Sequence, residues 1–123
     1  MKMDITPEEL QQNLKQFCGT EQYYPSSFRR LRLTDGVHYL RMKANCFWLV
    51  DIIESYHLKE PVKSTPFQVW KLTVDLDKHT GKVVCEDGNN NQLIEQELKY
   101  TDFPLEKMEL WCIDGVVLLP NEY

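Results

Sequence analysis

Three aspartates stand where this chain could carry acid–base chemistry or bind a cation. Asp35 and Asp102 each follow a threonine at a point where regular structure is expected to stop, and Asp51 lies in a strongly apolar stretch. Two carboxylates that meet in one cleft can serve as general acid and general base. Thr-Asp pairs also cap turns by accepting hydrogen bonds from nearby backbone N–H groups, and the sequence favours this structural role for Asp35 and Asp102. Asp51 is expected to be partly buried and therefore to need a polar partner.

The other patterns that mark catalytic or metal sites are weak. His38, His57 and His79 fall on three different expected elements, so a preformed zinc site is not predicted. The polar run 87–91 lacks the glycine and the glutamate that a calcium loop of the EF-hand type requires. The sequence contains no GxSxG elbow and no glycine-rich phosphate loop. We therefore predict no catalytic residue, no metal site and no cofactor.

Length and composition predict one globular domain spanning residues 1–123. Hydrophobic residues make up 42% of the chain and charged residues 27%, an ordinary balance for such a domain. The net charge of −5 argues against a broad surface for nucleic acid, so no nucleic-acid partner is expected. Arg29, Arg30 and Arg32 stand close together, which leaves a local basic patch open. We interpret them instead as part of a solvated strand edge.

The sequence also bears on cellular location. No apolar run approaches the ~18 residues that a membrane-spanning helix needs, and the first residues lack the apolar segment of a signal peptide. Four widely spaced cysteines lie among apolar neighbours: Cys18, Cys46, Cys85 and Cys112. Such cysteines are typical of reduced, mostly buried thiols. We therefore expect a cytoplasmic protein without a membrane partner.

The N-terminal half predicts two to three helices. Thr6 and Glu9 form a capping-box pattern at the start of the first helix, with Pro7 at its first position. A second, short helix is expected after Thr34 or Asp35. The third, residues 45–56, is apolar on nearly every side and is predicted to be a buried central helix. Between the first two helices, residues 28–33 are expected to form an edge strand.

The C-terminal half predicts an antiparallel sheet of about five strands between residues 67 and 119, with the helices packed on it. Residues 67–76 alternate between apolar and polar side chains, as a half-buried strand does. Pro104 interrupts the pattern, and Phe103 before it is expected to anchor this irregular segment in the core. Trp111 alternates with Leu110 and Cys112, so an outward-facing Trp111 is a candidate binding residue. Helices followed by consecutive antiparallel strands indicate an α+β fold.

Several short motifs carry a resemblance to a known family: Thr-Asp-Gly at 34–36, Trp-Leu-Val-Asp at 48–51, Phe-Gln-Val-Trp-Lys-Leu at 67–72, Cys-Glu-Asp-Gly at 85–88, Tyr-Thr-Asp-Phe-Pro at 100–104 and Leu-Pro-Asn-Glu-Tyr at 119–123. With this series the chain resembles, from about Leu14 onward, a family of small bacterial and phage proteins known only as a domain of unknown function. The resemblance implies a bacterial or mobile-element origin and brings no catalytic residue or cofactor.

Two functional hypotheses remain open. The first is a small non-enzymatic module that binds a protein partner, as an acidic inhibitor or an accessory factor. It would act as a monomer or homodimer. Its candidate binding residues are Asp35, Asp51, Asp102, Phe103 and Trp111. The second is a small enzyme or a binder of a small ligand or metal, with Asp35, Asp51 and Asp102 around a pocket. Aspartates brought together in an open cleft would favour the second hypothesis.

Overall fold

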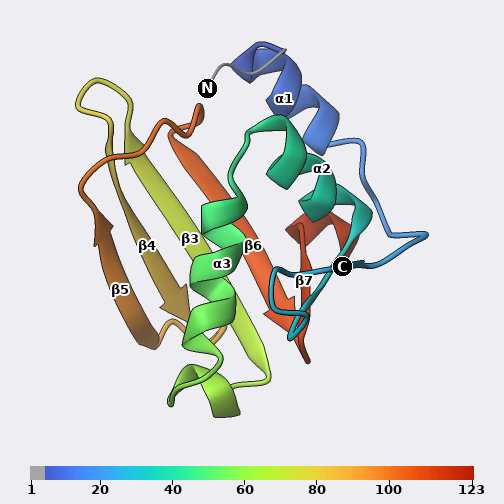
Figure 1. Cartoon of the computed structure of the whole chain (residues 1–123), viewed down its shortest axis with the longest axis vertical. Helices are drawn as coiled ribbons and strands as arrows, with labels where there is room; N and C mark the ends of the chain where they lie inside the picture. The colour runs from blue at the N-terminus through green and yellow to red at the C-terminus, as the bar shows by residue number, and fades with distance from the viewer. Residues whose placement is uncertain (1–4) are drawn as a thin grey trace.

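The computed structural model of the chain describes residues 5–123 and builds them into an α+β fold with one seven-stranded sheet (Figure 1). The helices are α1 (Pro7–Leu14), α2 (Asp35–Lys43) and α3 (Phe47–Tyr56), and two short 3-10 helices span Val62–Ser64 and Pro120–Glu122. The strands are β1 (Tyr24–Pro25), β2 (Arg32–Leu33), β3 (Phe67–Asp75), β4 (Thr80–Glu86), β5 (Gln92–Leu98), β6 (Lys107–Ile113) and β7 (Val116–Leu118). In the sheet they follow the order β1-β2-β7-β6-β3-β4-β5.

The starts of the first two helices follow the predicted caps. The Thr6 side chain accepts a hydrogen bond from the Glu9 amide, and the Glu9 carboxylate accepts one from the Thr6 amide, both at 3.1 Å. The Thr34 side chain accepts from the Val37 amide at the start of α2. Both arrangements satisfy amides that have no partner inside the helix.

The five C-terminal strands pair with one another in antiparallel fashion, as predicted. β3 lies at the centre, paired with β4 on one side and β6 on the other, while β5 and β7 extend the sheet outward. In β3 the even-numbered residues are buried and the odd-numbered ones are half-buried or exposed, which is the predicted period of two. Trp70 and Leu72 therefore face the helices.

The N-terminal part of the sheet corrects the prediction. Residues 28–33 do not form one edge strand: only Arg32 and Leu33 join the sheet as β2, and β1 becomes the edge. β2 pairs in parallel with β7, so the sheet is mixed rather than purely antiparallel. The segment before β2 leaves the extended conformation because the Ser26 amide donates to the Leu31 carbonyl oxygen at 3.0 Å, which closes a loop.

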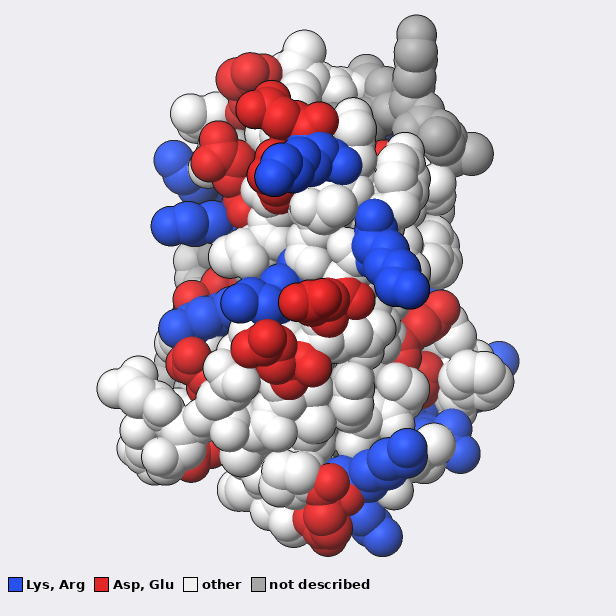
Figure 2. Space-filling view, turned by 90° about the vertical axis from the view of Figure 1, so that its left-hand side faces the viewer, with Lys and Arg blue, Asp and Glu red and all other residues white. Residues whose placement is uncertain are grey.

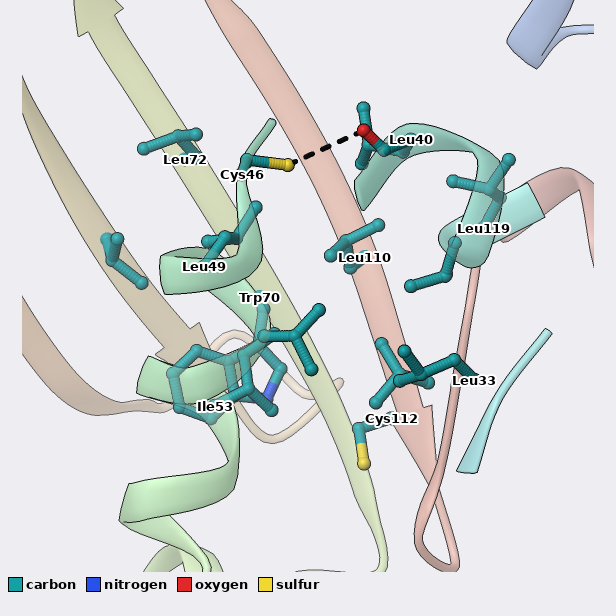
Figure 3. Packing of buried hydrophobic residues seen from close by; sticks show 14 of the residues in the cluster. Leu33, Leu40, Cys46, Leu49, Ile53, Trp70, Leu72, Leu110, Cys112 and Leu119 are labelled. Carbon is teal, nitrogen blue, oxygen red and sulfur yellow. Dashed lines mark hydrogen bonds between the residues drawn. The ribbon is translucent and has the colours of Figure 1, made fainter. Parts of the chain in front are cut away.

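The core lies between the sheet and the helices (Figure 3). Trp70, Ile53 and Leu110 are each no more than 1% exposed, and the Trp70 indole N–H donates to the buried Gln68 amide oxygen at 2.9 Å. Phe103 is 2% exposed and meets Trp48 edge-to-face at a centroid distance of 6.3 Å, so its predicted role as a core anchor is confirmed. Such aromatic pairs add to the free energy gained by burial.

The third helix is less deeply buried than its composition predicts. α3 lies across the sheet in front of β3 and β6 (Figure 1) and buries Leu49, Val50 and Ile53 against it. Phe47 on the same helix is 40% exposed. The predicted packing of this helix on the sheet is confirmed, but it is not buried on nearly every side: its outer side, with Phe47, meets solvent.

A clamp formed by the residues after β7 ties the ends of two helices together. The Glu122 carboxylate accepts from Thr34 Oγ1 (2.6 Å), from the Gly36 amide (3.0 Å) and from the Leu119 amide (2.9 Å). The Asn121 side chain donates to the carbonyls of Leu14 and Phe17 at the end of α1. A carboxylate at a helix N-terminus also interacts favourably with the helix dipole. The clamp thus joins the Thr-Asp-Gly and Leu-Pro-Asn-Glu-Tyr motifs.

Gly36 is predicted to be indispensable for this clamp. A Cβ at Gly36 would lie 2.6 Å from Leu119 Cδ1 and 2.7 Å from Glu122 Oε1, and hydrogen bonds hold Glu122 in place. We expect Gly36→Ala to lower the free energy of unfolding by about 1–3 kcal/mol through overpacking. Gly19→Ala is the matched control, because a Cβ there meets nothing within 4 Å. Urea unfolding of both variants measures the difference, and equal stabilities would contradict the clamp.

Candidate functional site

Asp35, the first of the predicted aspartates, accepts hydrogen bonds from the segment before β1. Asp35 in the first turn of α2 accepts from the Glu21 amide at 2.8 Å. This bond is the main reason that the pKa of the Asp35 carboxyl is lowered, and the hydroxyls of Tyr24 and Thr20 lower it further. Asp35 therefore holds the chain that leads into β1, which is a structural role.

The other two aspartates are placed differently from one another. Asp51 on α3 is half-buried and accepts from the Ser27 hydroxyl at 2.6 Å, so the expected polar partner is present. Asp102 is exposed, and the bond that orders its loop is donated by the Phe103 amide to Thr101 Oγ1. Within residues 5–123 no group of three or more His, Cys, Asp or Glu side chains is arranged to hold a metal ion. Asp35 and Asp51 bond to different segments, so the structure gives no support to a shared acid–base pair between them.

A histidine and a cysteine meet at a distance that sequence spacing did not indicate. Cys112 Sγ lies 3.5 Å from His57 Nε2, and His57 Nδ1 lies 2.8 Å from the Ile53 carbonyl oxygen. Burial raises the pKa of the Cys112 thiol to about 12, so the thiolate needed for nucleophilic attack is scarce at neutral pH. The pair is a partly buried contact between β6 and the end of α3.

Three of the four cysteines are buried as predicted: Cys46, Cys85 and Cys112. Cys18, which follows α1, is exposed and corrects the expectation for that residue. Burial raises the pKa of Cys46 and Cys85 to about 12 as well.

These environments predict the pattern of thiol labelling. A bulky disulfide reagent added to the native protein should modify one thiol quickly, and Cys18→Ser should abolish that phase. The remaining thiols should react only after unfolding. Rapid modification of the Cys18→Ser variant under native conditions would show that the buried assignments are wrong.

Glu54 holds the exposed loop between β1 and β2, and the sequence patterns did not identify it as a functional residue. Its side chain on α3 is buried, at 1% exposure, and faces the loop between β1 and β2. It accepts from the Ser26 hydroxyl, from the Phe28 amide (3.1 Å) and from the Arg30 amide (3.0 Å). Burial alone would raise the pKa of Glu54, but these hydrogen bonds and the nearby Arg30 charge outweigh it and lower the pKa. The available signal was its position four residues after Val50, on the apolar face of the helix.

The loop around Glu54 has a defined backbone. The Ser26 hydroxyl donates to Glu54 and accepts from the Leu31 amide, while the Ser26 carbonyl accepts from the Arg29 amide. Arg29 has a φ of 62°, which a non-glycine residue rarely adopts. We call residues 26–32 the arginine loop. Figure 1 shows it as the blue-green segment beside α3.

Arg41 forms hydrogen bonds to the start of the arginine loop. This buried side chain on α2 donates to the Pro25 carbonyl (3.4 Å) and to Ser27 Oγ (3.2 Å). Its guanidinium also lies 4.2 Å from the centre of the Phe47 ring. Cation–π contacts of this kind become stronger when they are shielded from water.

The outer side of the loop carries exposed aromatic and basic side chains. Phe28 is 72% exposed, and the Arg30 guanidinium lies 6.0 Å from the centre of its ring. Tyr23 is 54% exposed, and the Arg32 guanidinium lies 5.6 Å from its ring. Exposed aromatic and arginine side chains are enriched where proteins contact partners.

The sheet face that points away from the helices and the sheet edge at β5 differ from the surface of the arginine loop. Trp111 points away from the helices as predicted, but it is half-buried by Phe67 and Tyr123, with centroid distances of 5.4 Å to each. Seen from the side of β5, positive and negative residues are interspersed (Figure 2). Lys71 and Glu86 form an ion pair between strands β3 and β4.

Residues 5–123 form a small α+β domain. The model of a family of unknown function, DUF6876, matches residues 8–123, and the chain belongs to this family. The expected resemblance to a family of unknown function is thereby confirmed. Comparison with curated proteins and with solved structures gave no match. None of the helices in residues 5–123 has the length and apolar character that crossing a membrane requires.

The Glu54 carboxylate predicts a specific pH dependence of stability. Its pKa is lowered from 4.5 in the folded protein, so its contribution is fully present above that value and is lost as the pH falls through the folded-state pKa. We expect Glu54→Gln to lower the free energy of unfolding at neutral pH by about 1–3 kcal/mol, since an amide cannot accept all three bonds. The difference from the unmodified protein should shrink as the pH is lowered below 4.5. Urea unfolding across pH measures it, with the exposed Glu106→Gln as control.

Proposed function

We propose that the protein is a non-enzymatic module that binds a protein partner through the arginine loop and Tyr23. The observation that carries this proposal is the exposure of Phe28, at 72%, on a loop whose amides are held by a buried carboxylate. Ordering a flexible loop on binding costs conformational free energy, whereas this loop is already ordered in the free protein. Phe28 thus presents a large apolar ring from a backbone that Glu54 holds in place.

Glu54 and Arg41 support the proposal from opposite sides of the loop. The first holds the amides of Phe28 and Arg30, and the second holds Pro25 and Ser27. Neither buried charge leads to a catalytic group, and both act on the same short surface segment. Their arrangement is suited to presenting side chains to a partner.

The proposal includes a cytoplasmic protein of bacterial or phage origin that acts as an accessory factor. The rigid exposed surface is basic, although the chain as a whole has a net charge of −5. An acidic inhibitor that covers a basic target would be expected to present carboxylates at its most ordered exposed surface. The arginine loop presents the opposite charge, which favours the accessory role over the inhibitor.

Photocrosslinking tests which surface meets the partner. With p-benzoylphenylalanine in place of Phe28, we expect ultraviolet light to join the protein to one defined partner in cells of its source. Tyr100 is the matched control position, because it is also a largely exposed aromatic residue, at 71%, and lies away from the loop in sequence. A defined adduct from position 100 with none from position 28 would overturn the proposed surface.

Phe28→Ala should weaken capture of that partner by about tenfold or more, as truncation of a central aromatic contact does. Its unfolding midpoint should stay close to that of the unmodified protein, because Phe28 contributes little to the core. Tyr100→Ala is the control for partner binding. Unchanged partner affinity of Phe28→Ala would contradict the role given to this ring.

A further inference from the structure

We infer that the arginine loop recognises an acidic segment of its partner, with Asp and Glu carboxylates bound by the exposed arginines; this inference rests on the proposed function. The chain contains four arginines, and all of them lie in the loop or bond to it: Arg29, Arg30, Arg32 and Arg41. The remaining positive residues are lysines spread along the chain. This clustering of the arginines indicates that the loop requires guanidinium groups and not positive charge alone.

Arginine differs from lysine in the way it binds carboxylates. Its planar guanidinium donates two parallel hydrogen bonds to one carboxylate and also stacks on aromatic rings, while lysine acts as a compact point charge. Arg30 and Arg32 already lie beside the rings of Phe28 and Tyr23. Both arginines are nevertheless exposed, so their guanidinium groups remain accessible to a ligand.

The exposed arginines of the loop form no direct ion pair within residues 5–123. Arg29, Arg30 and Arg32 are all exposed, and none forms an ion pair with a carboxylate of residues 5–123. Arg30 does act electrostatically on the buried Glu54, whose oxygens are occupied by Ser26 and by backbone amides. Three exposed positive charges on one short loop would therefore attract a negative ligand.

The overall charge favours an acidic protein segment over a nucleic acid. Electrostatic interactions at physiological salt fall off over about 8 Å, so a short acidic segment is affected mainly by the arginine loop. A long polynucleotide would also meet the rest of a surface whose net charge is negative. The aromatic rings would pack on apolar side chains placed between the carboxylates of the segment.

Fluorescence anisotropy with the full chain tests this inference. The probe is a short labelled peptide in which Asp and Glu alternate with Leu, compared with the same peptide carrying Asn and Gln and with a labelled single-stranded oligothymidylate. We expect the acidic peptide to bind with an affinity that falls as salt is raised. The double variant Arg29→Gln/Arg30→Gln should weaken binding by about tenfold or more.

Two further variants separate geometry from charge. Arg29→Lys/Arg30→Lys keeps the charge and should still lose much of the affinity, because the paired hydrogen bonds are lost. Lys59→Gln/Lys78→Gln removes the same charge from exposed positions elsewhere and should leave the affinity nearly unchanged. Equal effects of the arginine and lysine removals would overturn the inference, and so would equal binding of the uncharged peptide.

The remaining outcomes distinguish this inference from the proposed function. Tighter binding of oligothymidylate than of the acidic peptide would replace the acidic segment by a nucleic acid. If no peptide binds while position 28 still crosslinks to a defined protein, the partner is not recognised through an acidic segment and the proposed docking surface stands. If the peptide binds but position 28 crosslinks to nothing, the recognition chemistry holds and the proposed protein partner fails.

Discussion

A carboxylate in a protein interior is costly unless its oxygens meet hydrogen-bond donors, and Glu54 meets this condition by drawing a surface loop around itself. Its donors are the hydroxyl of Ser26 and two amides separated by Arg29. Both amides can point inward only if the backbone between them turns sharply, and Arg29 does so with a positive φ. The buried charge therefore determines the shape of the arginine loop, and this shape places Phe28 and the arginines on its outer side.

The position of α2 depends on a second carboxylate, that of Glu122. Glu54 and Glu122 act on adjoining parts of the fold. Glu122 fixes the start of α2, while Arg41 on the last turns of the same helix reaches the beginning of the arginine loop. A shift of α2 along its axis would thus move Arg41 relative to Pro25. One helix, α2, thus contacts both the C-terminal clamp and the arginine loop.

The elements most accessible to prediction were those specified by local patterns. The alternation of β3 and the capping box of α1 involve neighbouring residues, so short windows of sequence revealed them. The parallel pairing of β2 with β7 was inaccessible because it joins Arg32 to Val116, and each strand is too short to show a period. The interpretation of residues 28–33 as a strand failed for a related reason: the competing partner, Glu54, lies on another element. Of the candidate site residues, Asp51 was correctly expected to be partly buried and Phe103 to be buried, yet neither signalled the loop that α3 supports.

The energetic cost of the arginine loop supports our proposal that it acts in recognition. Phe28 leaves most of its ring in water and so gains little from burial, and the adjacent arginines repel one another. The positive φ of Arg29 adds further cost to the same few residues. Conflict between local preference and the rest of a fold is expected at functional positions, where a partner supplies the missing interactions. A negative, partly apolar segment would neutralise the arginines and cover Phe28 at once, which relieves both unfavourable features with a single ligand.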